Sequence, residues 1–299
     1  MNGIIVVDKP AGLSSNRVLG RIKHLLGGVK AGFLGTLDPL ATGVLPVFVG
    51  KATKLIPLFE GLDKEYRVTL KLGERTDTLD AEGEVVETRP LEGLGEARVR
   101  EVIAGFAGPQ QQTAPAYSAV KHGGVPAYRL ARAGKAVPPR VRTVHLSEPV
   151  VEAVALPLVT FRVTASAGTY MRTLADDIGR TLGVGAHVTA LDRFRCGDLF
   201  LKEKSITLDK IEIALARNEG SFLLNPSALL TDFLPITVDS AQAHHLRHGR
   251  ILPLGPDAAA FLVADKVQAV TADGTLLAIG EVVQLPDRGL GFQPGKVLS

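Results

Sequence analysis

Two separate stretches of the chain alternate apolar and polar side chains with a period of two residues. They are KEYRVTLKLG at residues 64–73 and LVTFRVTAS at residues 158–166. This period places successive side chains on opposite faces, so each stretch is predicted to be a strand with one buried face. A third, apolar run at residues 3–8 is predicted to be a short buried strand. These three runs indicate a protein built around a β-sheet.

Helical periodicity occurs at two places in the chain. Ser14 and Ser15 can cap a helix whose apolar residues recur every three or four positions, and glycines at 27–28 end it. After Gly168, apolar residues every fourth position predict a second helix that Gly183 ends. No internal repeat or low-complexity tract interrupts this pattern. We therefore expect irregular alternation of helices and strands, not a solenoid or a propeller.

The last part of the chain reads as a unit of its own. Residues 217–237 are linker-like and rich in turn residues. Beyond them, Asp239 can cap a short helix, and a hairpin is expected to turn at Asp273 and Gly274. We therefore predict a first domain over residues 1–233 and a small β-rich domain over residues 234–299.

The charge of the chain is unevenly distributed. The 34 Lys and Arg against 31 Asp and Glu give a net charge of only +3. Counted by segment, residues 1–60 carry +4 and residues 117–150 carry +5, whereas residues 61–116 and 151–299 carry −4 and −2. The sum therefore hides two basic blocks, which are candidates for contact with a polyanion.

Cysteine content and hydropathy restrict the compartment. The single cysteine, Cys196, excludes an intrachain disulfide framework and any multi-cysteine zinc or iron–sulfur site. The N-terminus lacks the pattern of a secretory signal, and the most apolar stretch, near residues 150–161, contains Glu152 and Pro157. We expect a cytoplasmic protein that neither is exported nor spans a membrane.

The most unusual segment is GTLDPLATGVLPV at residues 35–47. Asp38 is the only ionisable side chain between Lys30 and Lys51, and Pro39 biases it towards an extended or turn conformation. An unpaired carboxylate in apolar surroundings is costly, so we expect a cation beside Asp38. From this segment alone, the alternative that Asp38 and Pro39 merely shape a turn has about equal weight.

Six segments, taken in order, resemble the TruB family of pseudouridine synthases. They are VVDKPAGLSSN (6–16), GTLDPLATG (35–43), KEYRVTLKLGERTDTLDAEG (64–83), APAYSAVKHGGVPAYRLARAG (114–134), ASAGTYMRTLADDIG (165–179) and HVTALDRF (187–194). The resemblance implies an α+β protein with the pseudouridine synthase fold: a central mixed, largely antiparallel sheet with flanking helices, followed by a small PUA-like β-barrel domain. It also implies a monomeric tRNA pseudouridine synthase, without cofactor or metal, that isomerises the T-loop uridine at tRNA position 55.

The resemblance implies catalytic roles for three residues. Asp38 matches the family's nucleophile, which attacks or stabilises C1′ of the ribose. Arg172 would pair with Asp38 through its two-pronged guanidinium. Tyr66 matches the active-site tyrosine, expected to stack on the uracil and a candidate base towards the ribose. The alternatives are a surface pair of Arg172 with Asp176 and a purely structural core position for Tyr66.

Further positions would contact the flipped nucleotide. By resemblance, Leu191 is an apolar cover over the base and Tyr170 a polar contact. Phe33 stands where the family usually has histidine, which keeps a ring in the pocket and removes a polar contact to the nucleotide. Asp192 stands where arginine is common, which weakens any phosphate contact there.

The second basic block lies in an insertion at about residues 110–150. Its glycines and prolines predict a flexible loop with a short helix rather than sheet. By resemblance the insertion grips the T-arm of tRNA, with Lys121, Arg129 and Arg132 as candidates to neutralise phosphates. Such contacts would offset the few kcal/mol that extrusion of the stacked uridine costs. A solvated charged surface is the alternative.

Two other functions are open on the residues alone. A nucleoside or glycoside hydrolase needs paired carboxylates, and the acid nearest to Asp38 in sequence, Glu60, lies 22 positions away. An RNA chaperone would use the same basic insertion but would leave the set of Asp38, Tyr66 and Arg172 unexplained. We expect catalysis as the primary function, with tRNA-folding chaperone activity beside it.

Two clusters resemble metal sites only superficially. His244, His245 and His248 include an i, i+4 pair, but no glutamate follows His244 as in HExxH and no cysteine is near. Asp77 and Asp80 are expected to be structural or to orient an arginine.

Overall fold

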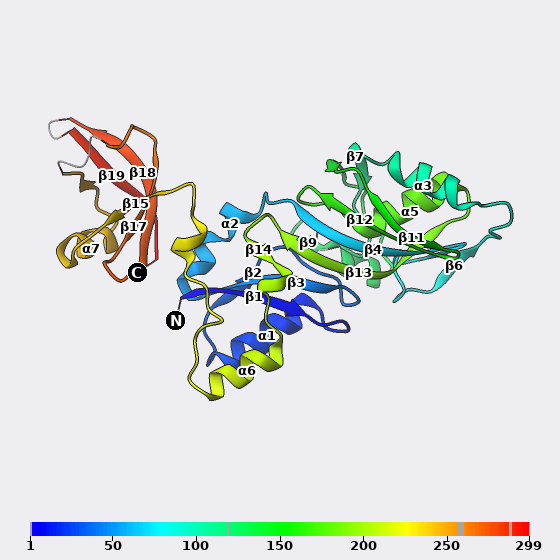
Figure 1. Cartoon of the computed structure of the whole chain (residues 1–299), viewed down its shortest axis with the longest axis horizontal. Coiled ribbons are helices and arrows are strands. Elements are labelled where there is room, and N and C mark those ends of the chain that lie inside the picture. The colour runs from blue at the N-terminus through cyan, green and yellow to red at the C-terminus, as the bar shows by residue number, and fades with distance from the viewer. Residues whose placement is uncertain (1, 119, 256–259, 287–288, 299) are drawn as a thin grey trace.

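This computed structural model describes residues 2–118, 120–255, 260–286 and 289–298, and the side chains of residues 121 and 122 also lie outside the description. The molecule is elongated, with a large sheet in its main body and a smaller sheet at one end (Figure 1). Within the described ranges, no helix combines the length and the apolar character needed to cross a membrane.

The main body is a ten-stranded sheet. Its path runs β1-β3-β13-β4-β12-β10-β7, with β2, β11 and β14 paired to its sides. The strands are β1 (Gly3–Lys9), β2 (Ala31–Phe33), β3 (Thr42–Val49), β4 (Lys64–Leu72), β7 (Gly108–Thr113), β10 (Val141–Leu146), β11 (Val150–Ala155), β12 (Leu158–Ala165), β13 (Ala186–Cys196) and β14 (Phe200–Leu201). Only β3 and β13 pair in parallel; the other pairings are antiparallel. The expectation of a mixed, largely antiparallel sheet is confirmed.

The three strands predicted from sequence are β1, β4 and β12. Along β4, alternate side chains from Lys64 to Leu72 are buried, and those between them are partly or fully exposed. The period-two pattern of the sequence therefore corresponds to one buried face and one more solvent-exposed face of β4. Strand β13 pairs with both β3 and β4 and so links the two halves of the sheet.

Helices pack against the sheet. The longer ones are α1 (Ser15–Leu25), α3 (Glu96–Ala104), α5 (Met171–Leu182) and α6 (Leu208–Ala216), and their buried residues share one core with the strands. Helix α1 begins at the Ser14 cap, whose Oγ accepts a hydrogen bond from the Arg17 amide at 3.2 Å. Helix α5 ends at Gly183, which has the left-handed φ of 78°. Both ends are as predicted, because serine and glycine are the residues that such caps favour.

Short elements complete the main body. They are the 3-10 turns η1 (Gly50–Leu55), η2 (Lys202–Lys204) and η3 (Pro226–Leu229), the helix α2 (Ile56–Phe59), and a two-stranded sheet of β5 (Glu74–Thr76) and β6 (Val85–Thr88).

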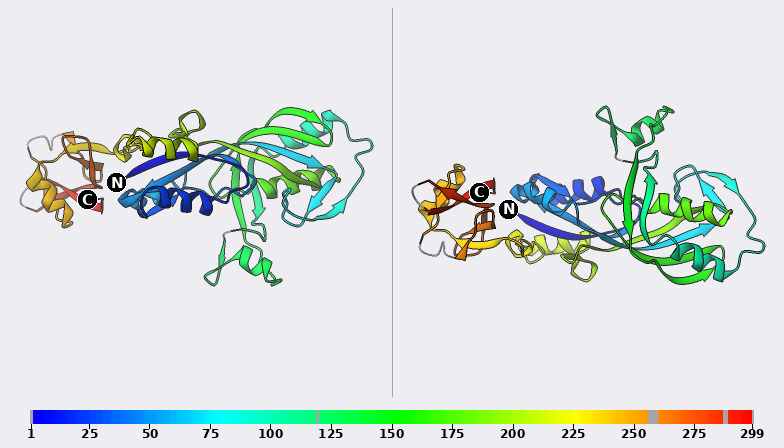
Figure 2. Two further views of the ribbon diagram at one scale, coloured as in Figure 1. Left: turned by 90° about the horizontal axis from the view of Figure 1, so that it is seen from below. Right: turned by 90° about the horizontal axis from the view of Figure 1, so that it is seen from above.

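The basic insertion projects away from the main sheet (Figure 2). Strands β7 and β10 form its stalk, and its outer part holds β8 (Lys121–His122), β9 (Val125–Pro126) and α4 (Ala127–Arg132). The short helix is confirmed, but the expectation of no sheet is wrong. Glycines at 123–124, both with positive φ, allow a tight hairpin between β8 and β9.

The smaller sheet is built from the C-terminal part of the chain. Its order is β15-β17-β18-β19-β16, with β15 (Leu234–Thr237), β16 (Leu252–Pro253), β17 (Lys266–Val270), β18 (Leu276–Leu285) and β19 (Gly289–Val297). Helix α7 (Ser240–Arg247) starts with a reciprocal capping box between Asp239 and Gln242. The predicted hairpin turn at Asp273 and Gly274 joins β17 to β18. Together with α7, the strands in the described part of this unit form the expected small PUA-like unit.

Candidate active site

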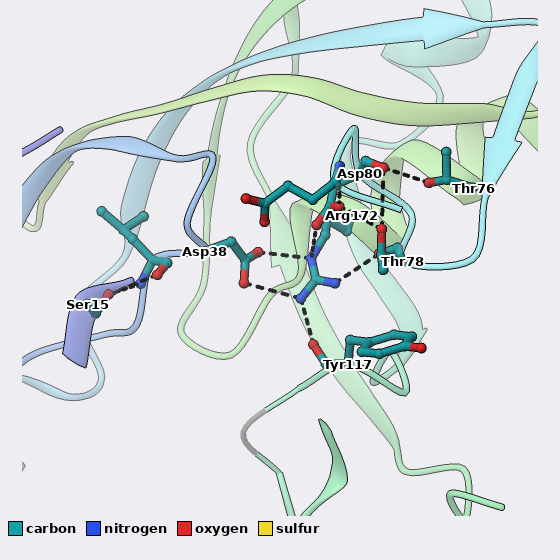
Figure 3. A network of polar contacts seen from close by, with 9 residues as sticks. Ser15, Asp38, Thr76, Thr78, Asp80, Tyr117 and Arg172 are labelled. Carbon is teal, nitrogen blue, oxygen red and sulfur yellow. Dashed lines mark hydrogen bonds and ion pairs between the residues drawn. The ribbon is translucent and has the colours of Figure 1, made fainter. Parts of the chain in front are cut away.

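The carboxylate of Asp38 faces the guanidinium of Arg172 (Figure 3). Arg172 donates from Nε to Oδ2 at 2.9 Å and from Nη2 to Oδ1 at 3.2 Å. This two-pronged contact fixes both oxygens of the carboxylate. The Arg172 side chain is 5% exposed and that of Asp38 is 32% exposed, so the arginine lies behind a carboxylate that a substrate can reach. Arg172 therefore supplies the cation that the apolar loop was expected to require.

The alternative pairing of Arg172 with Asp176 is wrong. Asp176 instead accepts a hydrogen bond from Arg75 Nε at 2.6 Å and lies 3.4 Å from Arg180 Nε. One turn of α5 thus points Arg172 towards the Asp38 loop, and the next turn points Asp176 towards other arginines.

Three further groups surround the Arg172 guanidinium. Its Nη1 donates to the Thr78 carbonyl oxygen at 2.9 Å and its Nη2 to the Tyr117 carbonyl oxygen at 2.8 Å. The Asp80 Oδ2 atom lies 3.6 Å from Nε, and its side chain is buried as well (Figure 3). Asp80 therefore orients an arginine, as expected. Because Tyr117 belongs to the basic insertion, Arg172 also ties that insertion to the Asp38 loop.

The first sequence motif clamps the backbone on both sides of Asp38. Ser15 Oγ accepts a hydrogen bond from the Leu37 amide at 2.8 Å and donates to the Leu37 carbonyl at 2.9 Å. On the other side, the Pro39 carbonyl accepts from the Gly12 amide at 2.8 Å and from Lys9 Nζ at 3.2 Å. The motif at residues 6–16 is recognisable from sequence, but this clamp is not, because it depends on contacts across the fold.

Lys9 is fully buried at this clamp. Burial lowers the pKa of its ammonium to about 8, and the nearby carboxylates of Asp38 and Glu82 partly oppose that shift. Lys9 is a second cation near Asp38, which sequence reasoning did not identify.

Tyr66 lies on the central strand β4 and is 8% exposed. Burial raises the pKa of its phenol, and the charge and side-chain hydrogen bonding of Arg193 oppose that rise. Leu191 lies on the neighbouring strand β13, where it pairs with Val68. The two adjacent strands thus bring the predicted stacking residue and the predicted apolar cover to one place.

The Asp38–Arg172 pair, Tyr66 and Leu191 line one cavity of about 700 Å³. Of the residues predicted from sequence, seven line it: Asp38, Tyr66, Arg172, Tyr170, Leu191, Phe33 and Arg132. Arg129 is exposed on α4 and is not among the lining residues. The side chain of Lys121 lies outside the described part of the structure. Segments from residues 14 to 193 therefore converge on one pocket.

Lining residues that sequence reasoning did not identify include Lys64, Ser118, Tyr128 and Arg193. The hydroxyl of Ser118 is buried and has no hydrogen-bond partner within the described residues. Ser118 and Tyr128 fall within the segment 114–134 that carries the family resemblance, so that segment was their only signal.

The stalk of the insertion holds the loop that carries Tyr170. Gln112 on β7 accepts from the Tyr170 amide at 3.0 Å and donates to its carbonyl at 3.3 Å. Arg142 on β10 donates to the Gly168 carbonyl at 3.3 Å, and its guanidinium lies 5.7 Å from the centre of the Tyr170 ring. Tyr170 is thus positioned by both strands of the stalk.

The two departures from the family pattern have different surroundings. Phe33, which stands where the resemblance led us to expect histidine, lines the cavity. Asp192 accepts a hydrogen bond from Thr42 Oγ1 at 3.0 Å and pairs with Lys202. The carboxylate of Asp192 therefore joins β13 to β3 and to η2.

The remaining clusters lie outside the cavity. In α7 the ring centres of His244 and His248 are 4.6 Å apart, and His248 Nδ1 contacts the His244 carbonyl at 2.9 Å. Asp77 Oδ1 accepts a hydrogen bond from the Glu84 amide at 2.9 Å, which is a structural contact.

Two family models match the chain. Residues 23–171 match the model of the TruB family pseudouridylate synthase (N terminal domain), and residues 172–235 match that of the tRNA pseudouridylate synthase B C-terminal domain. The chain is 44% identical to tRNA pseudouridine synthase B of Burkholderia mallei (strain NCTC 10247), with 96% of each protein covered. It is 45% identical to the protein of that name from Geobacter sulfurreducens, with 81% of this chain and 80% of that protein covered.

Solved structures show the same fold. A chain of an H/ACA ribonucleoprotein bound to a substrate RNA containing 2′-deoxyuridine superimposes with a TM-score of 0.68 at 25% identity, covering 99% of this chain and 85% of that one. A chain of a Cbf5–Nop10–Gar1 complex gives a TM-score of 0.68 at 27% identity, with the same coverage.

Proposed function

This chain belongs to the TruB family of pseudouridylate synthases and isomerises uridine to pseudouridine in tRNA, and from that premise we propose that its target is the T-loop uridine at tRNA position 55. The observation that carries the proposal is the two-pronged contact between Asp38 and Arg172 at a cavity that Tyr66 also lines. A flipped nucleotide needs a pocket with an aromatic or apolar side chain on which the base can stack, and the proposed chemistry adds the need for one accessible carboxylate.

In the proposed reaction, the Asp38 carboxylate attacks C1′ of the ribose. The electron pair of the breaking glycosidic bond moves to N1 of the uracil. The detached base turns within the cavity and bonds to C1′ through C5, which releases the carboxylate, while C5 loses its proton and N1 gains one. Arg172 holds both Asp38 oxygens throughout, so the carboxylate is aimed without reorganisation.

The cavity walls have separate roles in this proposal. Tyr66 stacks on the uracil, and Leu191 covers the base from the neighbouring strand. In the variant of the reaction in which Asp38 stabilises C1′ without bonding to it, the Tyr66 phenolate is the base towards the ribose: it takes a C2′ proton as the glycosidic bond breaks and returns it when C5 bonds to C1′. Phe33 on β2 and Tyr170 at the start of α5 contact other parts of the flipped nucleotide. Close walls keep the detached uracil from escaping and exclude competing water.

The basic insertion is proposed to bind the T-arm. It projects from the main sheet and carries Arg129 and Arg132 on its helix α4 (Figure 2). Phosphate contacts by these residues and by Lys121 would position the T-arm with little reading of sequence. The hydrogen bond from Arg172 to Tyr117 links this RNA-binding element directly to the catalytic pair.

The same contacts support a second proposed activity, a chaperone for tRNA folding, because a protein that opens the T-loop must hold a partly unfolded tRNA. We further propose a cytoplasmic monomer. All of the proposed catalytic residues come from one chain, so the site needs no partner subunit.

The test uses an unmodified tRNA transcript and a matched transcript with cytidine at position 55. We expect pseudouridine at position 55 of the first transcript and none elsewhere in its T-loop. Asp38→Asn should abolish product and retain tRNA binding, because the amide is isosteric but a poor nucleophile. Near-normal turnover by this variant would exclude Asp38 as nucleophile, and release of free uracil would indicate a hydrolase.

A further inference from the structure

The second arginine of the cavity, Arg193 on β13, is 1% exposed. Its Nε donates to the Val44 carbonyl at 2.7 Å and its Nη2 to the Gly35 carbonyl at 2.9 Å. No carboxylate of the described residues forms an ion pair with it, in contrast to Arg172. Burial of a guanidinium without an acidic partner lowers the stability of the folded protein, and an apolar side chain at this position would avoid that loss.

Arg193 contacts both ends of the loop that carries Asp38. Gly35 has a φ of +67°, and a Cβ there would lie 3.2 Å from Arg193 Nη1. Gly43 has a φ of +96°, and a Cβ there would lie only 2.3 Å from the Arg193 carbonyl oxygen. The two glycines that bracket Asp38 therefore fit closely around one residue, Arg193.

Arg193 also lies beside Tyr66. The two residues are directly opposite one another in the antiparallel pairing of β13 with β4, and both line the cavity. Directly opposed residues of an antiparallel pair place their side chains on one face, with Cβ atoms about 5 Å apart. One guanidinium thus contacts the backbone of the nucleophile's loop and faces the phenol of the proposed base.

We propose that Arg193 is a positioning residue for the isomerisation, which holds the Asp38 loop and the Tyr66 side chain in register and places a positive charge beside that side chain. This inference rests on the proposed role of Tyr66. Arg172 fixes the carboxylate itself, whereas Arg193 fixes the backbone on which the carboxylate stands and the group on the opposite strand.

The charges around Tyr66 set the direction of the expected effect. Burial has the largest effect and raises the pKa of the Tyr66 phenol. Arg193 opposes this rise, whereas Cys196 and Asp38 add to it. The buried Lys64 lies two residues before Tyr66 on β4 and faces Arg193 and Cys196. Removal of the Arg193 charge therefore removes the main influence that opposes the rise in the pKa of Tyr66. The phenol should then keep its proton to higher pH.

The test is a nuclear magnetic resonance titration of the full-length protein labelled at Cζ of tyrosine. The chain has only four tyrosines, and Tyr66→Phe identifies the resonance of Tyr66. In Arg193→Met we expect this resonance to titrate at a higher pH than in the wild type, with Arg193→Lys between the two. We also expect kcat to fall by about tenfold or more, because proton transfer typically contributes at least that much, with little change in KM for tRNA.

Arg195→Met is the matched control. Arg195 lies on the same strand, but its Nε binds Glu65 at 2.6 Å and its Nη1 binds Asp198 at 2.6 Å. Its removal should leave the Tyr66 titration unchanged.

The outcomes distinguish the role of Arg193 from the proposed role of Tyr66. An unchanged Tyr66 titration in Arg193→Met, with Tyr66→Phe inactive, would overturn the inference about Arg193 alone. If Tyr66→Phe keeps full activity, the role of Tyr66 as base is wrong, and the inference about the phenol fails with it. If Arg193→Met does not fold, Arg193→Lys is the variant that tests the inference. A Tyr66 titration and a kcat equal to those of the wild type in Arg193→Lys would show that any buried cation suffices. The guanidinium would then not position the loop.

Discussion

At the scale of single residues, the site depends on how tightly the Asp38 loop is held. Hydrogen bonds from Ser15 and Gly12 fix the residues on either side of Asp38, and the loop's two end glycines fit against Arg193. A loop fixed at so many points presents its carboxylate in one orientation, which lowers the entropic cost of reaching the reactive geometry.

Gly43 is expected to tolerate no side chain. Gly43→Ala would combine an unfavourable positive φ with a Cβ 2.3 Å from a backbone oxygen, so the backbone must move. We expect a decrease of at least about 1–3 kcal/mol in the free energy of unfolding, measured by urea denaturation, together with reduced kcat. Gly28→Ala is the control, because Gly28 has a φ of +83° but no atom within 4 Å of its Cβ position. An equal decrease in both variants would show that backbone strain alone, and not the close approach of Arg193, makes Gly43 necessary.

Lys9 is expected to make stability depend on pH in the alkaline range. Its pKa is about 8 in the folded protein and about 10.4 in an unfolded chain, so between these values the unfolded state binds more protons. Stability therefore rises with pH through this window as the buried ammonium loses its charge. Urea denaturation at pH 7 and pH 9.5 should show the wild type gaining stability relative to Lys9→Met. A constant difference between the two proteins would mean that Lys9 keeps its ordinary pKa.

At the scale of elements, the insertion contributes both charge and anchoring. Its stalk strands hold the Tyr170 loop through Gln112 and Arg142, and its Tyr117 carbonyl holds Arg172. An RNA bound to the outer part would therefore act on the element that also shapes the cavity.

Removal of the insertion's cations should weaken tRNA binding through electrostatics. The triple variant Lys121→Ala, Arg129→Ala, Arg132→Ala should bind more weakly, and the slope of log K against log salt should become shallower by about 0.7–0.9 for each phosphate that is no longer neutralised. Filter binding across a range of salt concentrations measures this slope. Arg98→Ala on α3 is the control, because its exposed side chain already pairs with Glu101. An unchanged slope in the triple variant would place the main RNA-binding surface elsewhere.

Local elements were the most predictable part of the fold. The strands β1, β4 and β12 and the ends of α1 and α5 follow from periodicity and capping residues, which act between near neighbours in sequence. The hairpin of β8 and β9 was missed because each strand has only two residues, too few to show a period.

The site was predictable only in part, for a related reason. Asp38 is visible because it is a lone charge in an apolar run, and family resemblance indicated its pairing with Arg172. Arg193 and Lys9 carry no such signal. Their positions follow from strand pairing and burial, which depend on segments far apart in the chain.

At the scale of the whole molecule, the two sheets share apolar contacts. One buried cluster includes Phe48 and Phe59 from the main body together with Ile279 and Leu298 from the C-terminal unit. Lys54 adds a hydrogen bond from Nζ to the Val297 carbonyl at 2.6 Å. The C-terminal unit therefore packs against the end of the main body where β1 begins (Figure 2), and unfolding of one part removes packing from the other.

This shared cluster should make thermal unfolding of the wild type a single cooperative transition. Ile279 is 4% exposed, and Ile279→Asp would place an unpaired carboxylate among apolar side chains, which is costly. We expect this variant to unfold in two steps by calorimetry, with the C-terminal unit melting first, because the packing that couples the two parts is disrupted. Ile213→Asp is the matched control: Ile213 is 52% exposed on α6, so its melting profile should equal that of the wild type. Two separate transitions already present in the wild type would show that the cluster is too small to couple the unfolding of the two sheets.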